Sequence, residues 1–207
     1  MDANLIYIDS YLPNLIVRRA SNLYMRAGIK SVSMDDVAAE CGISKKTLYK
    51  CFDKESLIQE VVKHHAQTSE ARIKSILTEN RDVVTEMTGL LLFTMDAVQE
   101  FSTQFLYSLK ATKSTGVHQF MSSFTNRVHQ AFIDNLNWGK AQGFYRSDVE
   151  SSIVVQLYFS QLQEIVDQQG IDRSSQWIEE LHSLFLFGIL TPKGLNCFSP
   201  LRLSDVA

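Results

Sequence analysis

The stretch SMDDVAAECGISKKTLYKCFDKESL, residues 33–57, decides the fold. It has the pattern of two short helices joined by a tight turn. Ser33 can cap the first helix, and Asp36, three residues later, can return the hydrogen bond in a capping box. Gly42 can end that helix, and Ser44 can cap the second one. This arrangement predicts a helix-turn-helix, in which the second helix is narrow enough to enter a DNA major groove.

Both short helices have one apolar face, as expected for helices that pack on a core. The residues expected in this core are Met34, Val37, Ala38, Cys41, Leu48 and Phe52. Asp53 can cap a further helix that runs from Lys54 to about Leu77. Upstream, an apolar stripe predicts a helix that has Pro13 in its first turn and ends before Gly28. Residues 1–12 have a weak pattern, and we expect an arm there.

The rest of the chain has the pattern of long amphipathic helices. Their expected ranges are 82–100, 102–112, 116–142, 148–169 and 174–187. Only nine glycines and three prolines occur in 207 residues, which favours helices over a sheet. The sequence therefore predicts an all-α fold, in which an N-terminal three-helix helix-turn-helix domain is joined by a long helix to a C-terminal helical domain. We expect the domains to cover residues 1–57 and 58–207.

Charge is distributed unevenly along the chain, although the net charge is only −3. From Pro13 to Lys54, eight basic side chains stand against four acidic ones, a net charge of +4. From Ala66 onward, eleven basic side chains stand against fifteen acidic ones, a net charge of −4. A basic segment followed by an acidic one is typical of a protein whose N-terminal part contacts phosphates.

Two lysines at the start of the second short helix conflict with its stability. Lys45 and Lys46 lie in its first turn, where the positive end of the helix dipole disfavours cations. Lys54 opens the next helix in the same way. Cations beside exposed helical N–H groups are favourable where a phosphate backbone binds. This conflict therefore indicates double-stranded DNA as a partner.

The segment from Ser44 to Leu57 closely resembles the recognition-helix signature of the TetR family of bacterial regulators. The upstream pattern, from Gly28 through Ser33-Met34-Asp35-Asp36-Val37-Ala38 to Cys41-Gly42-Ile43, matches as well. Residues 139–148 and 184–194 resemble the same family more loosely. The resemblance implies a ligand-responsive transcriptional repressor that binds a palindromic operator as a homodimer. A small-molecule effector, whose identity the sequence does not reveal, would release it.

The resemblance also implies DNA contacts in and around the second short helix. The expected contacts are Ser33, Ser44, Lys45, Lys46, Thr47, Tyr49, Lys50 and Lys54. Lys45 and Thr47 match family positions that reach base edges or nearby phosphates, and Tyr49 matches a tyrosine whose hydroxyl meets a phosphate. Lys54 and both serines match phosphate-positioning sites at helix starts. Cys51 departs from the family, many members of which carry His or Tyr there.

The helices expected at 148–169 and 174–187 are apolar on nearly every side, so they must be covered on all sides. The cover is either a large core within the chain or the same two helices of a second copy. The resemblance implies the second copy, and hence a two-fold symmetric operator. The expected dimer contacts are Leu157, Tyr158, Gln161, Trp177, Leu181, Leu184 and Phe185.

Aromatic residues are frequent between these two regions, and the resemblance implies an effector cavity among the central helices. The residues expected to line it are Phe93, Gln104, Phe105, His118, Phe124 and Trp138. Such a cavity needs a few polar contacts on apolar walls. An ordinary aromatic core explains the same residues equally well from the sequence.

Other function classes find little support in the sequence. No histidine stands in an HExxH motif, and no GxGxxG, Walker or GxSxG pattern occurs. We therefore expect no enzyme, no cofactor and no metal. The remaining alternative is a helical protein-interaction module that keeps the frame without using DNA.

The sequence also predicts the compartment. Its three cysteines, Cys41, Cys51 and Cys197, form no CxxC pair, and no export signal precedes them. No apolar run approaches the ~18 residues that a membrane span requires. A reduced cytoplasmic protein without a membrane partner is expected.

Overall fold

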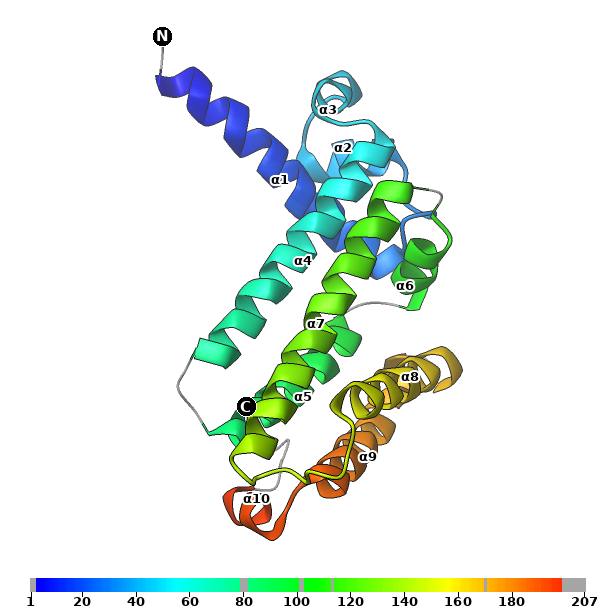
Figure 1. Cartoon of the computed structure of the whole chain (residues 1–207). Helices are drawn as coiled ribbons and strands as arrows, with labels where there is room; N and C mark the ends of the chain where they lie inside the picture. The colour runs from blue at the N-terminus through cyan, green and yellow to red at the C-terminus, as the bar shows by residue number, and fades with distance from the viewer. Residues whose placement is uncertain (1–2, 79–81, 101–102, 113, 170, 199–207) are drawn as a thin grey trace. The chain divides into compact units, whose positions relative to one another are not determined.

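The computed structural model describes residues 3–78, 82–100, 103–112, 114–169 and 171–198 (Figure 1). Within these ranges the chain forms ten helices. They are α1 (Ala3–Ala27), α2 (Met34–Cys41), α3 (Lys45–Cys51), α4 (Lys54–Thr78), α5 (Val83–Glu100), α6 (Thr103–Lys110), α7 (Thr115–Ala141), α8 (Ser151–Gln169), α9 (Ile171–Ile189) and α10 (Pro192–Cys197). The predicted all-α fold, with its N-terminal helix-turn-helix and C-terminal helical domain, is confirmed.

Two compact units make up the chain. The first comprises Met1–Ser69 and Glu100–Phe124, and the second comprises Glu70–Gln99 and Thr125–Ala207. These units are defined by which residues pack together. The predicted boundary after Leu57 instead separates a DNA-binding domain from a ligand-binding and dimerisation domain, so it stays a prediction.

The first unit contains the helix-turn-helix, with α2 packed against both α1 and α3 (Figure 1). Its core gathers apolar side chains from α1, α2, α3, α4, α6 and α7. The fully buried ones are Ile16, Ala20, Tyr24, Val37, Leu48 and Leu57. The expected core residues Met34 and Ala38 are buried, and Cys41 and Phe52 pack against the core while partly exposed.

Helix α1 begins at Ala3, so the predicted arm over residues 1–12 is wrong for its described part, and Pro13 lies inside the helix. A proline has no N–H to donate to the carbonyl four residues earlier, yet its fixed φ suits a helix. Leu5, Ile8 and Leu12 recur at helical spacing on the N-terminal side of this proline. That periodicity was the signal for a longer helix.

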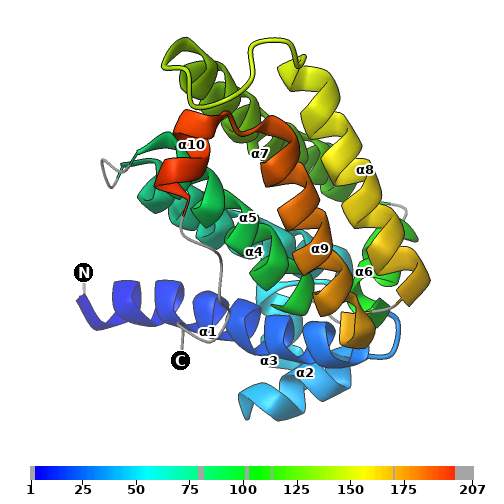
Figure 2. The same ribbon diagram turned by 90° about the horizontal axis from the view of Figure 1, so that it is seen from below.

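The second unit is built on α5, the second half of α7, and the antiparallel pair α8 and α9, which lie side by side (Figures 1 and 2). Asp82 caps α5, because its Oδ1 atom accepts from the backbone N–H groups of Val84 and Thr85 at 3.0 Å. The fully buried core side chains here are Met87, Leu90, Leu91, Phe132, Leu136, Ile178 and Leu186.

A turn after α7 is tied to the end of α9. Gly143 adopts a left-handed φ of 76°, and Tyr145 forms an isolated antiparallel bridge with Leu190. The Tyr145 hydroxyl donates to the carbonyl of Val83 at 2.7 Å. The short helix α10 follows, capped by Thr191. Its six residues are too few to show a periodicity, which is why the sequence did not predict it.

Across the described ranges, no helix is both long enough and apolar enough to cross a membrane.

Candidate nucleic-acid interface

Helix α2 begins with the predicted capping box. The Asp36 backbone N–H donates to Ser33 Oγ at 3.2 Å, and the Ser33 backbone N–H donates to Asp36 Oδ2 at 2.8 Å. The hydrogen bonds from Ser33 hold the pKa of Asp36 below its usual value. Two backbone donors are thus satisfied locally, which fixes where the helix begins.

The turn between α2 and α3 depends on Gly42, whose φ of 67° favours a residue without a side chain. The backbone N–H of Ile43 donates to the carbonyl of Ala38 at 3.0 Å and closes the turn. Ser44 Oγ then accepts from the Thr47 backbone N–H at 3.1 Å and caps α3. The orientation of α3 is therefore set by two caps and one glycine.

Helix α3 has one buried side and one exposed side. Leu48 is fully buried, and Cys51 packs partly buried against the same core. The side chains that α3 exposes are Lys45, Lys46, Tyr49 and Lys50, with Thr47 half-buried. Tyr49 is 50% exposed although it is aromatic. This surface offers three cations and a phenol hydroxyl, which are groups that bind phosphates and base edges.

Two of the predicted DNA-contacting lysines already have partners within the first unit. Lys45 Nζ lies 2.8 Å from Asp35 Oδ1, and this carboxylate raises the pKa of Lys45. Lys54 is half-buried and donates through Nζ to the carbonyl of Val32 at 2.8 Å. Lys54 therefore ties the start of α4 to the segment before α2.

Asp53 caps α4 as predicted. The Ser56 backbone N–H donates to Asp53 Oδ1 at 2.8 Å, and the Asp53 backbone N–H donates to Ser56 Oγ at 3.1 Å. These hydrogen bonds hold the pKa of Asp53 below its usual value. Every helix of the helix-turn-helix after α1 thus begins at a side-chain cap.

The second unit buries a polar trio where α5, α8 and α9 meet. The Tyr158 hydroxyl lies 2.6 Å from Thr94 Oγ1 and 3.0 Å from His182 Nε2. Thr94 Oγ1 donates its proton to the carbonyl of Leu91 at 2.7 Å, so it accepts from the Tyr158 hydroxyl. His182 Nε2 lies 3.3 Å from the same Thr94 oxygen. Burial lowers the pKa of His182 from 6.5 to about 4, so this imidazole is neutral at pH 7.

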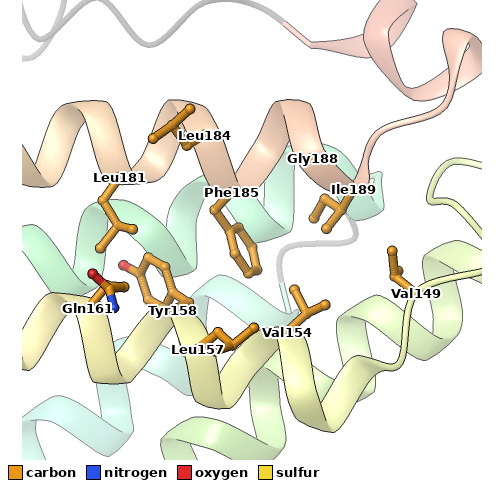
Figure 3. Close-up of a pocket in the computed structure, with 10 residues that line it drawn as sticks. All are labelled: Val149, Val154, Leu157, Tyr158, Gln161, Leu181, Leu184, Phe185, Gly188 and Ile189. Carbon is orange, nitrogen blue, oxygen red and sulfur yellow. The ribbon is translucent and has the colours of Figure 1, made fainter.

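Helices α8 and α9 expose large apolar side chains on their outer side. These are Ile153, Leu157, Trp177, Leu184 and Phe187, each more than half exposed. Between the two helices runs an open groove of about 240 Å³ (Figure 3). Tyr158 and Phe185 point into the space between the helices, and Leu157 and Gly188 also line the groove.

The helix-turn-helix matches a known family. Residues 16–61 match the model described as bacterial regulatory proteins, tetR family. The matched residues span the last part of α1, the whole of α2 and α3, and the first turns of α4. The helix-turn-helix of this chain is that of the tetR family. Residues 16–61 therefore form the helix-turn-helix of a DNA-binding transcriptional regulator.

Curated relatives of this chain are transcriptional regulators. The HTH-type transcriptional repressor KstR2 of Mycolicibacterium smegmatis is 25% identical over 143 residues, which cover 67% of this chain and 70% of the relative. KstR2 of Mycobacterium tuberculosis is 21% identical over 143 residues, covering 67% of this chain and 72% of the relative.

Solved structures share the fold at low sequence identity. The ketosteroid regulator KstR2 of Mycobacterium tuberculosis has a TM-score of 0.63 at 16% identity, covering 88% of this chain and 96% of that one. The fatty acid degradation regulator FadR of Bacillus halodurans has a TM-score of 0.68 at 16% identity, with coverages of 86% and 96%. A transcriptional regulator of Saccharomonospora viridis in complex with choline has a TM-score of 0.70 at 18% identity, with coverages of 86% and 97%.

The six residues predicted to line an effector cavity of this regulator are divided between the units. Phe105 is buried in the core of the first unit, and His118 is exposed there and bonds through Nε2 to the carbonyl of Thr112. Phe93 is buried in the second unit, whereas Trp138 is 51% exposed. Phe124 is half-buried in the first unit, and the side chain of Gln104 lies outside the described residues. The cavity therefore stays a prediction.

The predicted dimer residues of the regulator differ in exposure. Leu157, Trp177 and Leu184 are more than half exposed, Gln161 is exposed and Leu181 is half-buried. Tyr158 and Phe185 are instead buried, with 2% and 8% of their surface exposed, because they pack in the core of their own chain and line the groove. Within the described residues, no group of three or more His, Cys, Asp or Glu side chains could hold a metal ion.

Sequence reasoning missed several polar residues of this regulator. Asp35, which pairs with Lys45, was read only as part of a helix start. His182 lies four residues from both Ile178 and Leu186, which are fully buried, so helical periodicity would have placed it in the core. Ser21 Oγ lies 2.5 Å from His65 Nε2. This hydrogen bond between α1 and α4 could not be predicted from a local sequence pattern.

Proposed function

We propose that this tetR-family regulator is a repressor that binds a two-fold symmetric operator as a homodimer and leaves it when a small effector binds. The observation that carries the proposal is the exposed side of α3. Lys45, Lys46 and Lys50 stand there around an exposed Tyr49, above a fully buried Leu48. A recognition helix with a fixed core side and a cationic outer side suits major-groove binding.

Contacts to DNA divide into two kinds in this proposal. Lys45, Lys46 and Thr47 read base edges or hold nearby phosphates, and Tyr49 and Lys50 contact the backbone. Ser33 and Ser44 stand at helix starts, where backbone N–H groups favour a phosphate oxygen. Phosphate contacts position the helix, and base contacts select the sequence. The curated KstR2 relatives are named repressors, which supports repression over activation.

The homodimer is supported by the outer side of α8 and α9. Five large apolar side chains are more than half exposed there, and Leu184 reaches 71%. An apolar surface on this scale is typical of an interaction site rather than of a monomer surface. Pairing through one patch on each copy gives two-fold symmetry, and the operator would then be palindromic.

The effector is proposed to bind in the second unit. Phe132, Tyr158, Phe159 and Phe185 form a ring cluster there, with centroid distances from 4.9 to 6.5 Å. The solved structures with this fold include regulators named for ketosteroids and for fatty acid degradation. An apolar effector with few hydrogen-bonding groups suits walls of this kind.

Helix α4 carries the response in this mechanism, because the boundary between the units falls inside it, after Ser69. Its C-terminal part is paired within the second unit, where Arg72 Nη2 lies 2.6 Å from Asp96 Oδ2 and Arg127 pairs with Glu70. An effector that binds one arrangement of these helices more tightly shifts the population of the DNA-competent state.

Selection of genomic fragments by the purified full-length protein tests the function. We expect enrichment of an imperfect palindrome, with binding whose log affinity falls with log salt by about 0.9 per phosphate neutralised. The variants Lys46→Ala and Thr47→Ala should reduce enrichment, whereas Lys74→Ala on the distant end of α4 should not. Random fragments recovered equally by all four proteins would contradict the proposal.

A further inference from the structure

Nothing within the single chain requires a glycine at position 188 of α9. Among the described glycines, Gly28, Gly42 and Gly143 have a positive φ. Gly188 does not have one. At Gly139 and Gly194, a Cβ atom would lie 2.2 and 2.3 Å from other atoms of the chain. At Gly89 and Gly116 it would meet a side chain at 3.0 and 3.4 Å.

A Cβ atom on Gly188 would meet nothing within 4 Å. The Gly188 carbonyl accepts from Arg146 Nη1 at 3.1 Å, but any residue could supply that carbonyl. Inside a helix, glycine is less favourable than alanine because it loses more backbone entropy. The open space beside Gly188 is therefore unexplained by the helix and by the chain around it.

That open space belongs to the groove between α8 and α9 (Figure 3). The side chains that line the groove with Gly188 are Val149, Val154, Leu157, Tyr158, Gln161, Leu181, Leu184, Phe185 and Ile189, none of them charged. A dry apolar cavity of about 150 Å³ holds a benzene ring. The groove, at about 240 Å³, therefore has room for an aromatic or branched aliphatic side chain.

The amount of apolar surface around the groove indicates what covers it. At their exposed fractions, the five large side chains of α8 and α9 present on the order of 600 Å² of apolar surface. This area approaches the roughly 800 Å² that each partner contributes to a standard protein interface. Charged residues are depleted from the cores of such interfaces, as they are from this groove.

We propose that the α9 helices of two copies cross at Gly188, and that each copy inserts an apolar side chain into the other's groove. This inference rests on the proposed homodimer and adds its contact point. Absence of a side chain at Gly188 lets the second backbone approach closely, as small residues do at tightly packed helix crossings. Each groove is incomplete until the second copy fills it.

Dissociation constants of full-length variants, measured by analytical ultracentrifugation, test the contact point. Gly188→Ala adds one methyl group where its own chain leaves open space, so each copy should fold with at least its original helix content. We expect it to weaken the dimer at least tenfold, and Gly188→Leu more than a hundredfold. Ser183→Ala is the matched control, because this exposed residue lies roughly 140° around α9 from Gly188.

The outcomes separate the contact point from the dimer itself. If Gly188→Leu dimerises like the original chain while Leu184→Ser does not, the dimer stands and the crossing at Gly188 is wrong. A chain that stays monomeric at micromolar concentration would overturn both the homodimer and this inference. Residues 199–207, which include Leu201 and Leu203, are another candidate occupant. A monomer whose groove binds a hydrophobic dye only after their removal would show that this segment fills it.

Discussion

Lys45 Nζ lies 2.8 Å from Asp35 Oδ1, so the first residue of the recognition helix is paired with a carboxylate of the helix before it. Both side chains are largely exposed, at 59% and 63%. A phosphate oxygen that approaches Lys45 must compete with Asp35 and is repelled by its charge. We therefore expect the pair to weaken non-specific attraction to DNA and to favour one orientation of Lys45.

Replacing Asp35 by Asn should tighten binding to random DNA more than binding to the operator. We expect two- to five-fold tighter binding to a random duplex, because one negative charge leaves the phosphate-facing side. Operator affinity should rise less, since a freed Lys45 loses its orientation. Fluorescence anisotropy at two salt concentrations measures both affinities.

Glu60→Gln is the matched control for Asp35→Asn, because Glu60 pairs with Lys63 on α4 at 3.4 Å, away from α3. It should leave the ratio of operator to random affinity unchanged. An equal gain on both duplexes in Asp35→Asn would show that Asp35 acts by long-range charge alone and does not orient Lys45.

The local structure of the DNA-binding unit could be predicted because its signals are local. Ser33, Ser44 and Asp53 each bond to a residue three positions later, so the caps are visible in the sequence itself. Gly42 marks the turn in the sequence as well, because a glycine commonly ends a helix. Because Leu48 is buried, the residues on the opposite face of α3 are the exposed ones.

Long-range pairing could not be predicted in this way. Whether Asp35 reaches Lys45, or Ser21 reaches His65, depends on how helices pack, and nothing in the spacing of these residues encodes it. Tyr158 shows the same limit within one helix. The sequence predicts that α8 is apolar all round, but only packing decides that Tyr158 is buried while Leu157 is exposed.

Two lysines of the DNA-binding unit should behave differently on replacement by alanine. Lys46 has an exposed side chain, so Lys46→Ala should lower operator affinity about five- to tenfold and leave thermal stability unchanged. Lys54 donates to the carbonyl of Val32 at 2.8 Å. Lys54→Ala should therefore lower the melting temperature and weaken binding to all DNA sequences alike. Differential scanning fluorimetry and anisotropy measure the two effects. A normal melting temperature in Lys54→Ala would contradict the structural role of this lysine.

Gly139 of α7 should not tolerate a side chain. A Cβ atom there would lie 2.2 Å from ring carbons of Tyr145, which is itself fixed by its bond to the carbonyl of Val83. Gly139→Ala should therefore destabilise the protein by about 3 kcal/mol. At Gly116, in the same helix, a Cβ atom would meet the flexible end of Gln59 at 3.4 Å and Ser114 Oγ at 3.9 Å, so Gly116→Ala should have little effect. Urea unfolding distinguishes the two variants, and equal midpoints would show that the turn after α7 is loose.

Burial of His182 should make stability fall as the pH is lowered. Burial lowers the pKa of His182 in the folded chain from 6.5 to about 4. Between these two values the unfolded chain binds the proton and the folded chain does not, so the free energy of unfolding rises with pH. The contribution of His182 to the free energy of unfolding is fully present above pH 6.5 and is lost as the pH falls toward 4.

Unfolding by urea at pH 7 and pH 5 measures this loss, which should be about 2 kcal/mol from His182 alone. His182→Gln keeps a hydrogen-bonding group beside Tyr158 but cannot bind the proton, so its free energy of unfolding should depend much less on pH. Some dependence should remain, because burial also lowers the pKa values of His65 and His129. If His182→Gln loses as much stability as the original chain between the two pH values, the imidazole is not buried as a neutral group against Thr94 and Tyr158.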